Sequence, residues 1–329
     1  NKAPKLGLVD VPNHRSSHKN PIPRGAGIIF GGLFLLAITM KGFSCINENY
    51  LIILAIVLVY IIGIIDDLKT IQAKTKLAVI LAAAFFVYLS GYEIDSIGTY
   101  FGYELNLGWA ALPFTLFAIA AFTNAVNLTD GLDGLAGTLS VIMLSTILYI
   151  GIVHDDKMLM YWSSFLIAVL LGFLLLNWHP AKVFMGDTGS LFLGFVIAVL
   201  TLDAFEYLNP TSILFFAAMP ILDTLIVFRR RLQRGKSPFT PDKNHMHHIL
   251  FNAKQDKAFT VRMLIFMQLS FSLMFIQVHQ QDDLLNLIMF GILFMVFFNL
   301  FDPRIRRRPK NAIIRKKHKK NKEVEQDNA

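Results

Sequence analysis

The sequence predicts an all-α membrane protein, a polytopic bundle of about ten transmembrane helices. Of its 329 residues 54% are hydrophobic and only 16% are charged, whereas a soluble domain of this length carries more charge. The hydrophobic residues form long blocks between short polar loops, and each block approaches the roughly 20 residues that cross the hydrocarbon core. Because backbone amides inside lipid must be paired within their own segment, we expect these blocks to be helices.

The expected spans pack as one bundle rather than as separate domains. They cover residues 25–41, 50–65, 76–91, 109–126, 135–153, 159–177, 189–203, 211–228, 260–279 and 284–301. Residues 1–303 are therefore expected to form one transmembrane domain, followed by a basic tail over residues 304–329. The chain begins with Asn1 rather than Met, so we expect that an upstream piece, which could hold one further span, is missing. With a single Cys45, disulfides play no part.

Lysine and arginine are concentrated on one side of the predicted bundle. Of the 31 such residues, only Lys41 and Lys157 lie in the opposite loops, while Lys76 and Arg262 sit at span ends on the basic side. Positively charged loops stay in the cytoplasm, so both ends of the chain are expected to be cytoplasmic. The basic tail is expected to lie near anionic lipid headgroups, and nucleic acid is not expected as a partner.

Carboxylates gather in four loops that the charge pattern assigns to the cytoplasmic side. These loops are rich in Gly and Asn, and they comprise Ile65–Leu68, Asn124–Gly134, Asn177–Ser190 and Pro241–His248. Because all four lie on one face of the predicted bundle, we expect them to converge on one site.

The first two loops indicate a cation site. Asp66 and Asp67 are adjacent, and like charges repel unless a cation or a proton separates them; the alternative is a solvated helix end. Asp130 and Asp133 would share one face of a helix, and Gly131 beside them would let the backbone approach a ligand closely. The alternative is that Asp133 caps the helix that follows. Residues 127–134 contain no Lys or Arg, which favours a bound cation over a cap.

The third loop places Asp187 directly before an apolar helix. A helix N-terminus offers free N–H groups and a positive dipole to a phosphate. The alternative is an ordinary N-cap made by Thr188 or Ser190, and the two interpretations are compatible.

The fourth loop holds three histidines beside several basic residues. The spacing of His245, His247 and His248 does not suit zinc. Arg230 and its basic neighbours favour the recognition of an anion, and a solvated basic loop is the alternative. Asp223 lies inside the span 211–228, and an ionisable group at membrane depth is by default a functional candidate.

The donor atoms of these loops favour magnesium. They are carboxylate and amide oxygens without a thiolate, which suits Mg²⁺; Mn²⁺ is an alternative. Magnesium beside basic residues suits a diphosphate substrate, because the ion neutralises charge and aligns the attacking and leaving oxygens. The residues thus predict a membrane enzyme that handles phosphates. The rival class is an ion-coupled transporter, but transporters tend to place their key groups near the bilayer midplane and between repeats.

With these motifs the chain resembles the polyprenyl-phosphate N-acetylhexosamine-1-phosphate transferases. The resemblance rests on residues 7–15 with His18, on residues 21–25 and 63–67, on Asn124–Gly134, on Pro180–Ser190 and on Arg230–His248. The His-x-His-His pattern favours the bacterial branch that primes O-antigen, common-antigen or teichoic acid synthesis over the peptidoglycan enzyme. Gly25-Ala26-Gly27 departs from the Gly-Gly pair of many relatives.

The resemblance implies a reaction. N-acetylglucosamine-1-phosphate would pass from UDP-N-acetylglucosamine to undecaprenyl phosphate at the cytoplasmic face of the bacterial inner membrane, releasing UMP, with residues 1–303 as the catalytic domain. The alternatives are another UDP-N-acetyl sugar (GalNAc, QuiNAc or FucNAc) or the MurNAc-pentapeptide donor of peptidoglycan synthesis. A two-step route through an aspartyl phosphate is also open, as is the oligomeric state, a homodimer included.

The resemblance also implies roles for individual residues. Asp187 and Asn127 would hold the metal, and Asp66 and Asp67 would act in catalysis on the lipid phosphate. Asp130 and Asp133 are counted with the catalytic carboxylates. The remaining expected contacts are with the substrates, and they come from Arg24, Lys76, Asn124, Gly131, Leu132, Asn177, Phe184, Arg230, His245, His247 and His248.

Overall fold

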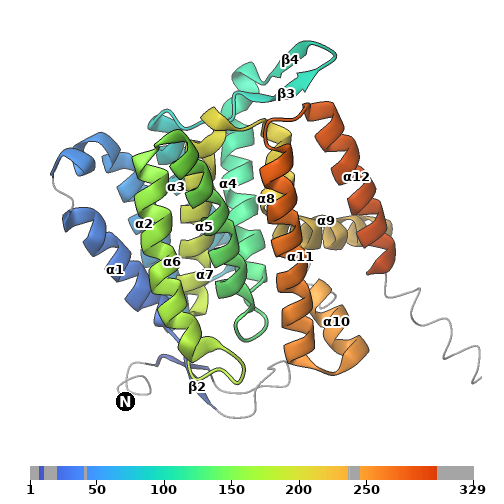
Figure 1. Ribbon diagram of the computed structural model, residues 1–329. Helices are drawn as coiled ribbons and strands as arrows, with labels where there is room; N and C mark the ends of the chain where they lie inside the picture. Colours follow the sequence, from blue (N-terminus) through green and yellow to red (C-terminus); the bar gives the residue numbers. More distant parts are fainter. Residues whose placement is uncertain (1–6, 11–20, 41–42, 236, 238–244, 302–329) are drawn as a thin grey trace, which may run out of the picture.

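The protein is a helix bundle with two short antiparallel sheets of two strands each (Figure 1). The computed structural model describes residues 7–10, 21–40, 43–235, 237 and 245–301, and for residues 40–49 it describes no side chains. The helices are α1 (Ala26–Met40), α2 (Phe43–Leu68), α3 (Ala73–Leu89), α4 (Ala111–Leu128), α5 (Leu135–His154), α6 (Lys157–Asn177), α7 (Gly186–Asp203), α8 (Ile213–Phe216), α9 (Ala218–Gln233), α10 (Met246–Lys254), α11 (Lys257–Val278) and α12 (Asp283–Leu300).

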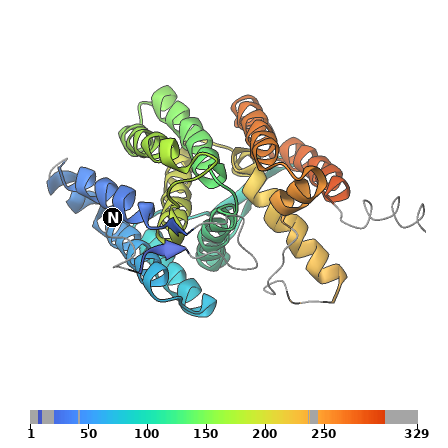
Figure 2. The same cartoon turned by 90° about the horizontal axis from the view of Figure 1, so that it is seen from below.

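Two antiparallel strand pairs lie at opposite ends of the bundle (Figure 1). At the lower end, which also carries α10, β1 (Val9–Asp10) pairs with β2 (Ile22–Pro23). At the upper end, β3 (Ser96–Tyr100) pairs with β4 (Tyr103–Asn106). Seen from below, the N-terminal helices, in blue, and the C-terminal helices, in orange, lie on opposite sides of the bundle (Figure 2).

The described helices support an all-α, multi-pass membrane protein but do not support the expected count of ten spans. Seven helices in the described part are long and apolar enough to cross a membrane, and eight if the bent pair α8 and α9 is one span. Helix α1, whose described residues end at Met40, has 15 residues and α3 has 17, which is at or below the short end of the roughly 17–25 residues of transmembrane helices. Every other predicted block corresponds to a candidate span.

The predicted span 211–228 is broken in its middle. Residues Pro210–Phe216 and α9 meet at an angle of 93°, and Ala217 between them has a non-helical conformation. Gln268 of α11 satisfies the backbone at the break: its amide nitrogen donates to the Phe216 carbonyl at 2.7 Å, and its oxygen accepts from the Met219 N–H at 3.1 Å. A buried side chain thus replaces the hydrogen bonds that a continuous helix would have made.

Helix α7 is the centre of the bundle, because every residue from Thr188 to Leu202 is buried. It packs most extensively on α2 and α4 and also on α1. Glycines allow these approaches: a Cβ added to Gly63 of α2 would lie 2.5 Å from the Thr188 Cα, and one added to Gly27 of α1 would lie 2.2 Å from the Gly189 nitrogen. The close packing brings the end of α2 against the start of α7, where the acidic loops meet.

Several sequence-based expectations lie outside the described residues. They concern part of the N-terminal motif (residues 11–20), Asp242 with its neighbours, and the basic tail over 304–329.

Candidate active site

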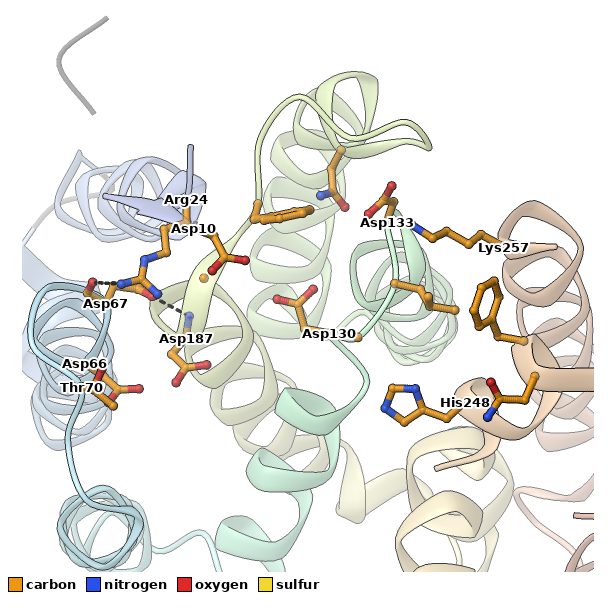
Figure 3. Close-up of a pocket in the computed structure, with 17 residues that line it drawn as sticks. Asp10, Arg24, Asp66, Asp67, Thr70, Asp130, Asp133, Asp187, His248 and Lys257 are labelled. Atoms are coloured by element: carbon orange, nitrogen blue, oxygen red, sulfur yellow. Dashed lines mark hydrogen bonds between the residues drawn. The ribbon is translucent and has the colours of Figure 1, made fainter. Parts of the chain in front are cut away.

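A cavity of about 680 Å³ opens at the end of the bundle that carries β1, β2 and α10. Its walls come from all the elements on which the acidic loops were predicted, so the expected convergence of four loops is confirmed for their described parts. The lining residues are Asp10, Arg24, Asp66, Asp67, Thr70, Asp130, Gly131, Leu132, Asp133, Asn177, Phe184, Gly186, Asp187, His248, Phe251, Asn252 and Lys257 (Figure 3).

Asp67 fixes the start of α7. Its carboxylate, at the end of α2, accepts hydrogen bonds from the backbone N–H groups of Asp187 and Thr188, both at 3.0 Å, and from the Thr188 hydroxyl at 2.5 Å. Gly186 is required here because its φ is +73° and because a Cβ would lie 2.5 Å from the Asp67 carboxylate. Asp67 therefore acts as the N-terminal cap of a helix that follows it by more than a hundred residues.

This contact corrects two expectations about the third loop. The capping position of α7 is Met185, which makes no side-chain cap, so neither Thr188 nor Ser190 is the N-cap. Two of the free N–H groups that α7 was expected to offer to a phosphate are taken by Asp67. Anion binding at this terminus is therefore weaker than the sequence suggested.

Lys76 joins two of the predicted carboxylates. Its ammonium lies 2.8 Å from the Asp66 carboxylate and 2.9 Å from that of Asp187. Asp66 also accepts from the Ile71 N–H at 2.6 Å, which holds the turn between α2 and α3. A lone lysine between two carboxylates leaves the pair with a net negative charge.

Asn127 supports Asp187 from the side of α4. Its amide nitrogen donates to Asp187 at 3.2 Å and to the Ser190 hydroxyl at 2.7 Å. The contact orients the Asp187 carboxylate, and the expectation that Asn127 itself coordinates a metal stays a prediction.

The loop with Asp130 and Asp133 is a turn rather than a helix, so the expectation of a shared helical face was wrong. Asp133 does not cap α5, whose capping residue is Gly134. Instead, Asp133 lies 2.7 Å from the His179 imidazole and accepts from the Ala181 N–H at 3.3 Å. Its partners lie in the α6–α7 connection, so it ties two walls of the cavity together.

Asp130 faces the cavity. It lies between Asp67 and Asp187 on one side and Asp133 and His248 on the other (Figure 3). Burial raises the pKa of its carboxyl to about 7, and the negative charges of Asp187, Asp67 and Asp133 add to this effect. Among the described residues no hydrogen bond stabilises its charged form. Asp130 is thus a carboxylate that needs a cation or a proton from outside the chain.

Asn177 and Phe184 form the wall nearest the N-terminal strands. The Asn177 side chain accepts from the Gly134 N–H at 2.9 Å and donates to the Val183 carbonyl at 2.8 Å. Phe184 pairs through its backbone with Arg24, whose guanidinium donates to the Asp67 carbonyl at 2.7 Å. The N-terminal segment is thereby attached to both the α6–α7 connection and the end of α2.

The histidines of the fourth loop divide into two groups. His248 lines the cavity, whereas His245 and His247 are buried behind it. The His247 ring fills the space beside Gly131, where a Cβ would lie 2.5 Å from its Nε2. Gly131 therefore makes room for a side chain of the protein as well as facing the cavity. Burial lowers the pKa of His247 to about 3, so this ring is neutral near pH 7.

Five of the predicted substrate-binding residues are not among those that line the cavity, namely Lys76, Asn124, Arg230, His245 and His247. Asn124 is exposed on α4, and Arg230 is buried on α9; neither lines the cavity. Sequence reasoning also missed lining residues: Asp10, Thr70, Phe251, Asn252 and Lys257. Phe251 and Asn252 follow His248 by three and four positions, so helical periodicity past the histidines would have found them.

The donor set fits a magnesium ion. Asp130 and Asp187 carry carboxylates on the same cavity, and the pKa of Asp130 rises in part because of the Asp187 charge. Within the described residues no group of three or more His, Cys, Asp or Glu side chains could hold a metal alone. Mg²⁺ suits such an incomplete set, because it is commonly bound by one or two carboxylates together with water and substrate phosphates.

Comparison with known proteins gives the family. Glycosyl transferase family 4 matches residues 49–205. A protein of Bacillus subtilis (strain 168), named probable undecaprenyl-phosphate N-acetylglucosaminyl 1-phosphate transferase, is 38% identical over 255 residues, which is 75% of this chain and 70% of that protein. The chain belongs to glycosyl transferase family 4.

Relatives from two further bacteria carry a similar name, undecaprenyl-phosphate alpha-N-acetylglucosaminyl 1-phosphate transferase. The protein of Yersinia pestis is 34% identical over 261 residues (76% of this chain, 71% of that protein), and that of Escherichia coli (strain K12) is 34% identical over 262 residues with the same coverage. The segment that matches family 4 runs from within α2 to just beyond α7. It includes Asp66, Asp130 and Asp187 and ends before the histidine loop.

Proposed function

We propose that this membrane transferase moves N-acetylglucosamine-1-phosphate from UDP-N-acetylglucosamine to undecaprenyl phosphate and releases UMP. The reaction would depend on Mg²⁺ and take place at the cytoplasmic face of the bacterial inner membrane, as the first step of an envelope polysaccharide. The names of the relatives support the acceptor and the transferred group, and the UDP-linked donor rests on the family resemblance. The concentration of basic loops at the cavity end supports the orientation.

The observation that carries the proposal is the arrangement of Asp66, Lys76 and Asp187 opposite Asp130. Two carboxylates share one ammonium, and a third has a pKa raised to about 7. Several carboxylates so close together repel a diphosphate unless a divalent cation lies between the carboxylates and the diphosphate. The cavity, with a volume of about 680 Å³, is of the size that small-molecule sites commonly have.

The reaction needs an oxygen of the lipid phosphate to attack the sugar-linked phosphorus of the donor. The bond from that phosphorus to the bridging oxygen breaks, and UMP leaves with the electron pair. When bound, Mg²⁺ would neutralise the diphosphate and the charge that develops on the leaving phosphate. Asp187 and Asp130 would hold it, since both side chains line the cavity.

The remaining residues act by position and charge. A phosphate monoester is already ionised near pH 7, so Asp66 is not required to remove a proton and instead holds Lys76 beside the approaching lipid phosphate. Asp67 keeps Asp187 in place through the start of α7. Following the resemblance, Asn177, Phe184 and residues Gly131–Asp133 would contact the uridine, and His248 lies across the cavity from Asp66 and Asp187 (Figure 3).

The test is a panel of UDP-sugars with undecaprenyl phosphate and Mg²⁺, scored by UMP release from the purified protein. We expect UDP-N-acetylglucosamine to give the highest kcat/KM, and the C4 epimer UDP-N-acetylgalactosamine to be poorer because an inverted hydroxyl leaves a hydrogen bond unmade. Preference for another UDP-N-acetyl sugar would change the donor and keep the reaction class. Solute flux into proteoliposomes without UMP release would overturn the transferase in favour of a transporter.

A further inference from the structure

Asp223 is a buried carboxylate that the proposed reaction does not use. It lies in the second turn of α9, just after the break in the membrane-spanning segment, and it is only 6% exposed. A charged side chain at such a place is costly unless it is paired and hydrogen-bonded. Its partners therefore show what it is for.

Both partners belong to the start of α10. One Asp223 oxygen lies 2.8 Å from the His245 Nδ1, and the other accepts from the Met246 N–H at 2.7 Å. His245 is the capping residue of α10 and makes no side-chain cap of its own. Asp223 supplies the missing acceptor from another helix, and it binds the ring and the backbone of α10 with one carboxylate.

The contact also fixes the tautomer of His245. A carboxylate can only accept hydrogen bonds, so Nδ1 carries the proton and, in the neutral ring, Nε2 is left as an acceptor. The His245 ring stacks on that of His247 at 5.8 Å between centroids with an interplanar angle of 11°. His247 in turn fills the space beside Gly131 of the Asp130 loop. A series of contacts thus connects Asp223, through His245 and His247, to Gly131, which lines the cavity.

Helix α10 provides one wall of that cavity. His248, Phe251 and Asn252 lie on one face of α10 and line the cavity. Most of the connection between α9 and α10 lies outside the described residues, and Asp223 anchors the first turn of α10 to α9 through two hydrogen bonds.

We propose that Asp223 is a positioning residue for the sugar-nucleotide donor, acting through His245 and the first turn of α10. The identity of the donor rests on the proposed function, whereas the anchoring of α10 does not. Asp223 touches no substrate in this arrangement. Its effect reaches the donor because the same helix carries His248, Phe251 and Asn252.

The variant D223N separates this role from a structural one. An asparagine oxygen can still accept from the Met246 N–H, but its amide nitrogen must donate to His245 Nδ1 and so selects the opposite tautomer. We expect KM for UDP-N-acetylglucosamine to rise about tenfold, as for the loss of one charge-assisted hydrogen bond. KM for undecaprenyl phosphate and the midpoint of thermal unfolding in detergent should stay within about twofold and a few degrees of wild type.

A double-mutant cycle tests the path of the effect. If Asp223 acts through His245, then D223N should change KM for the donor little in an H245Q background, because contacting residues are not additive. The matched control is D203N, which changes a carboxylate on α7 that is not among the cavity-lining residues and is expected to leave KM for both substrates unchanged. Independent, multiplicative effects of D223N and H245Q would overturn the proposal, as would a wild-type donor KM in D223N.

Hydrogen exchange tests the anchor without using activity. D223A removes both contacts, so amides 246–254 should exchange faster than in wild type while those of α5 and α6 are unchanged. Unaltered protection of α10 in D223A would contradict the anchoring, whether or not the wild-type protein releases UMP. If the wild-type protein releases no UMP but D223A still loses protection of α10, the proposed reaction is overturned and the anchoring is supported.

Discussion

Buried or half-buried carboxylates lie at both ends of the bundle, and the two ends use them differently. At the end with the β3–β4 hairpin, Asp283 accepts from the N–H groups of Thr99 and Thr211 and from the Thr211 hydroxyl. Asp156 caps α6 and accepts from the Tyr207 hydroxyl. At the cavity end, Asp66 and Asp187 share one lysine, and the charged form of Asp130 gains no hydrogen bond from the described residues.

The difference shows that burial of an acid does not by itself mark a functional site. A carboxylate whose oxygens are occupied by backbone donors stabilises the fold, whereas one with unused acceptor capacity can bind a cation. Asp67 lies at the cavity but belongs to the first class, because it accepts three hydrogen bonds from the start of α7. We infer that Asp67 positions Asp187, whereas its expected catalytic role stays a prediction, and the following predictions test this division.

The largest effect is expected from D187N. The change removes the charge that holds Lys76 and that would bind the metal, so UMP release should fall by about a thousandfold or more, comparable to the loss of a main electrostatic contribution to catalysis. Thermal unfolding in detergent should stay near wild type because the α7 cap made by Asp67 uses the backbone N–H. Wild-type turnover in D187N would contradict a metal site at this end of the bundle.

A glycine on α2 should matter almost as much as the acids it positions. Gly63→Ala places a Cβ 2.5 Å from the Thr188 Cα, so α2 must move away from α7 and carry Asp66 and Asp67 with it. We expect a loss of stability of about 1–3 kcal/mol, as for other overpacked sites, together with a large fall in kcat. The control is Gly172→Ala on α6, where nothing lies within 4 Å of the added Cβ; equal effects of the two changes would contradict the argument.

The Asp130 carboxyl should make metal binding depend on pH. Its pKa is raised from 3.8 to about 7, so in the metal-free fold it holds a proton up to near neutral pH, and its contribution to stability falls as pH rises from about 4 through 7. A bound cation must displace that proton. The increase in unfolding temperature caused by Mg²⁺ should therefore grow between pH 6 and pH 8.

The matched variant for this pH effect is D130N. It cannot lose a proton, so the Mg²⁺-induced increase should be smaller and nearly independent of pH over the same interval. Retention of the full pH dependence in D130N would assign it to another group.

The smallest effect on catalysis is expected at the opposite end. D283N replaces an acceptor of three hydrogen bonds by an amide that can accept through only one of its atoms, which should cost about 1–3 kcal/mol of stability. KM for both substrates should remain at the wild-type value, because the hydrogen-bond partners of Asp283 within the described part of the chain lie in β3 and just before α8. A change in donor KM would show that the two ends are coupled and would break the comparison.

The sequence by itself determined the helical membrane class and the loops that carry the site. Both depend on local properties, namely the length and hydropathy of apolar blocks and the sorting of charge between loops. Hydropathy, however, did not reveal that the segment around Ala217 is bent. The backbone groups at the bend are hydrogen-bonded by the side chain of Gln268, which lies 49 and 52 positions further along the chain than its two partners.

Only the tertiary structure decided which partner each polar group has. Asp67 and Thr188 are 121 positions apart, and Lys76 and Asp187 are 111 apart; neither pairing leaves a trace in the local pattern. For the same reason Asn124 and Asp133, two members of one polar stretch, have different surroundings, since α4 turns one outward and the α6–α7 connection binds the other. Local sequence fixes helices because their hydrogen bonds are local, whereas the chemistry of a carboxylate depends on donors that long-range packing brings to it.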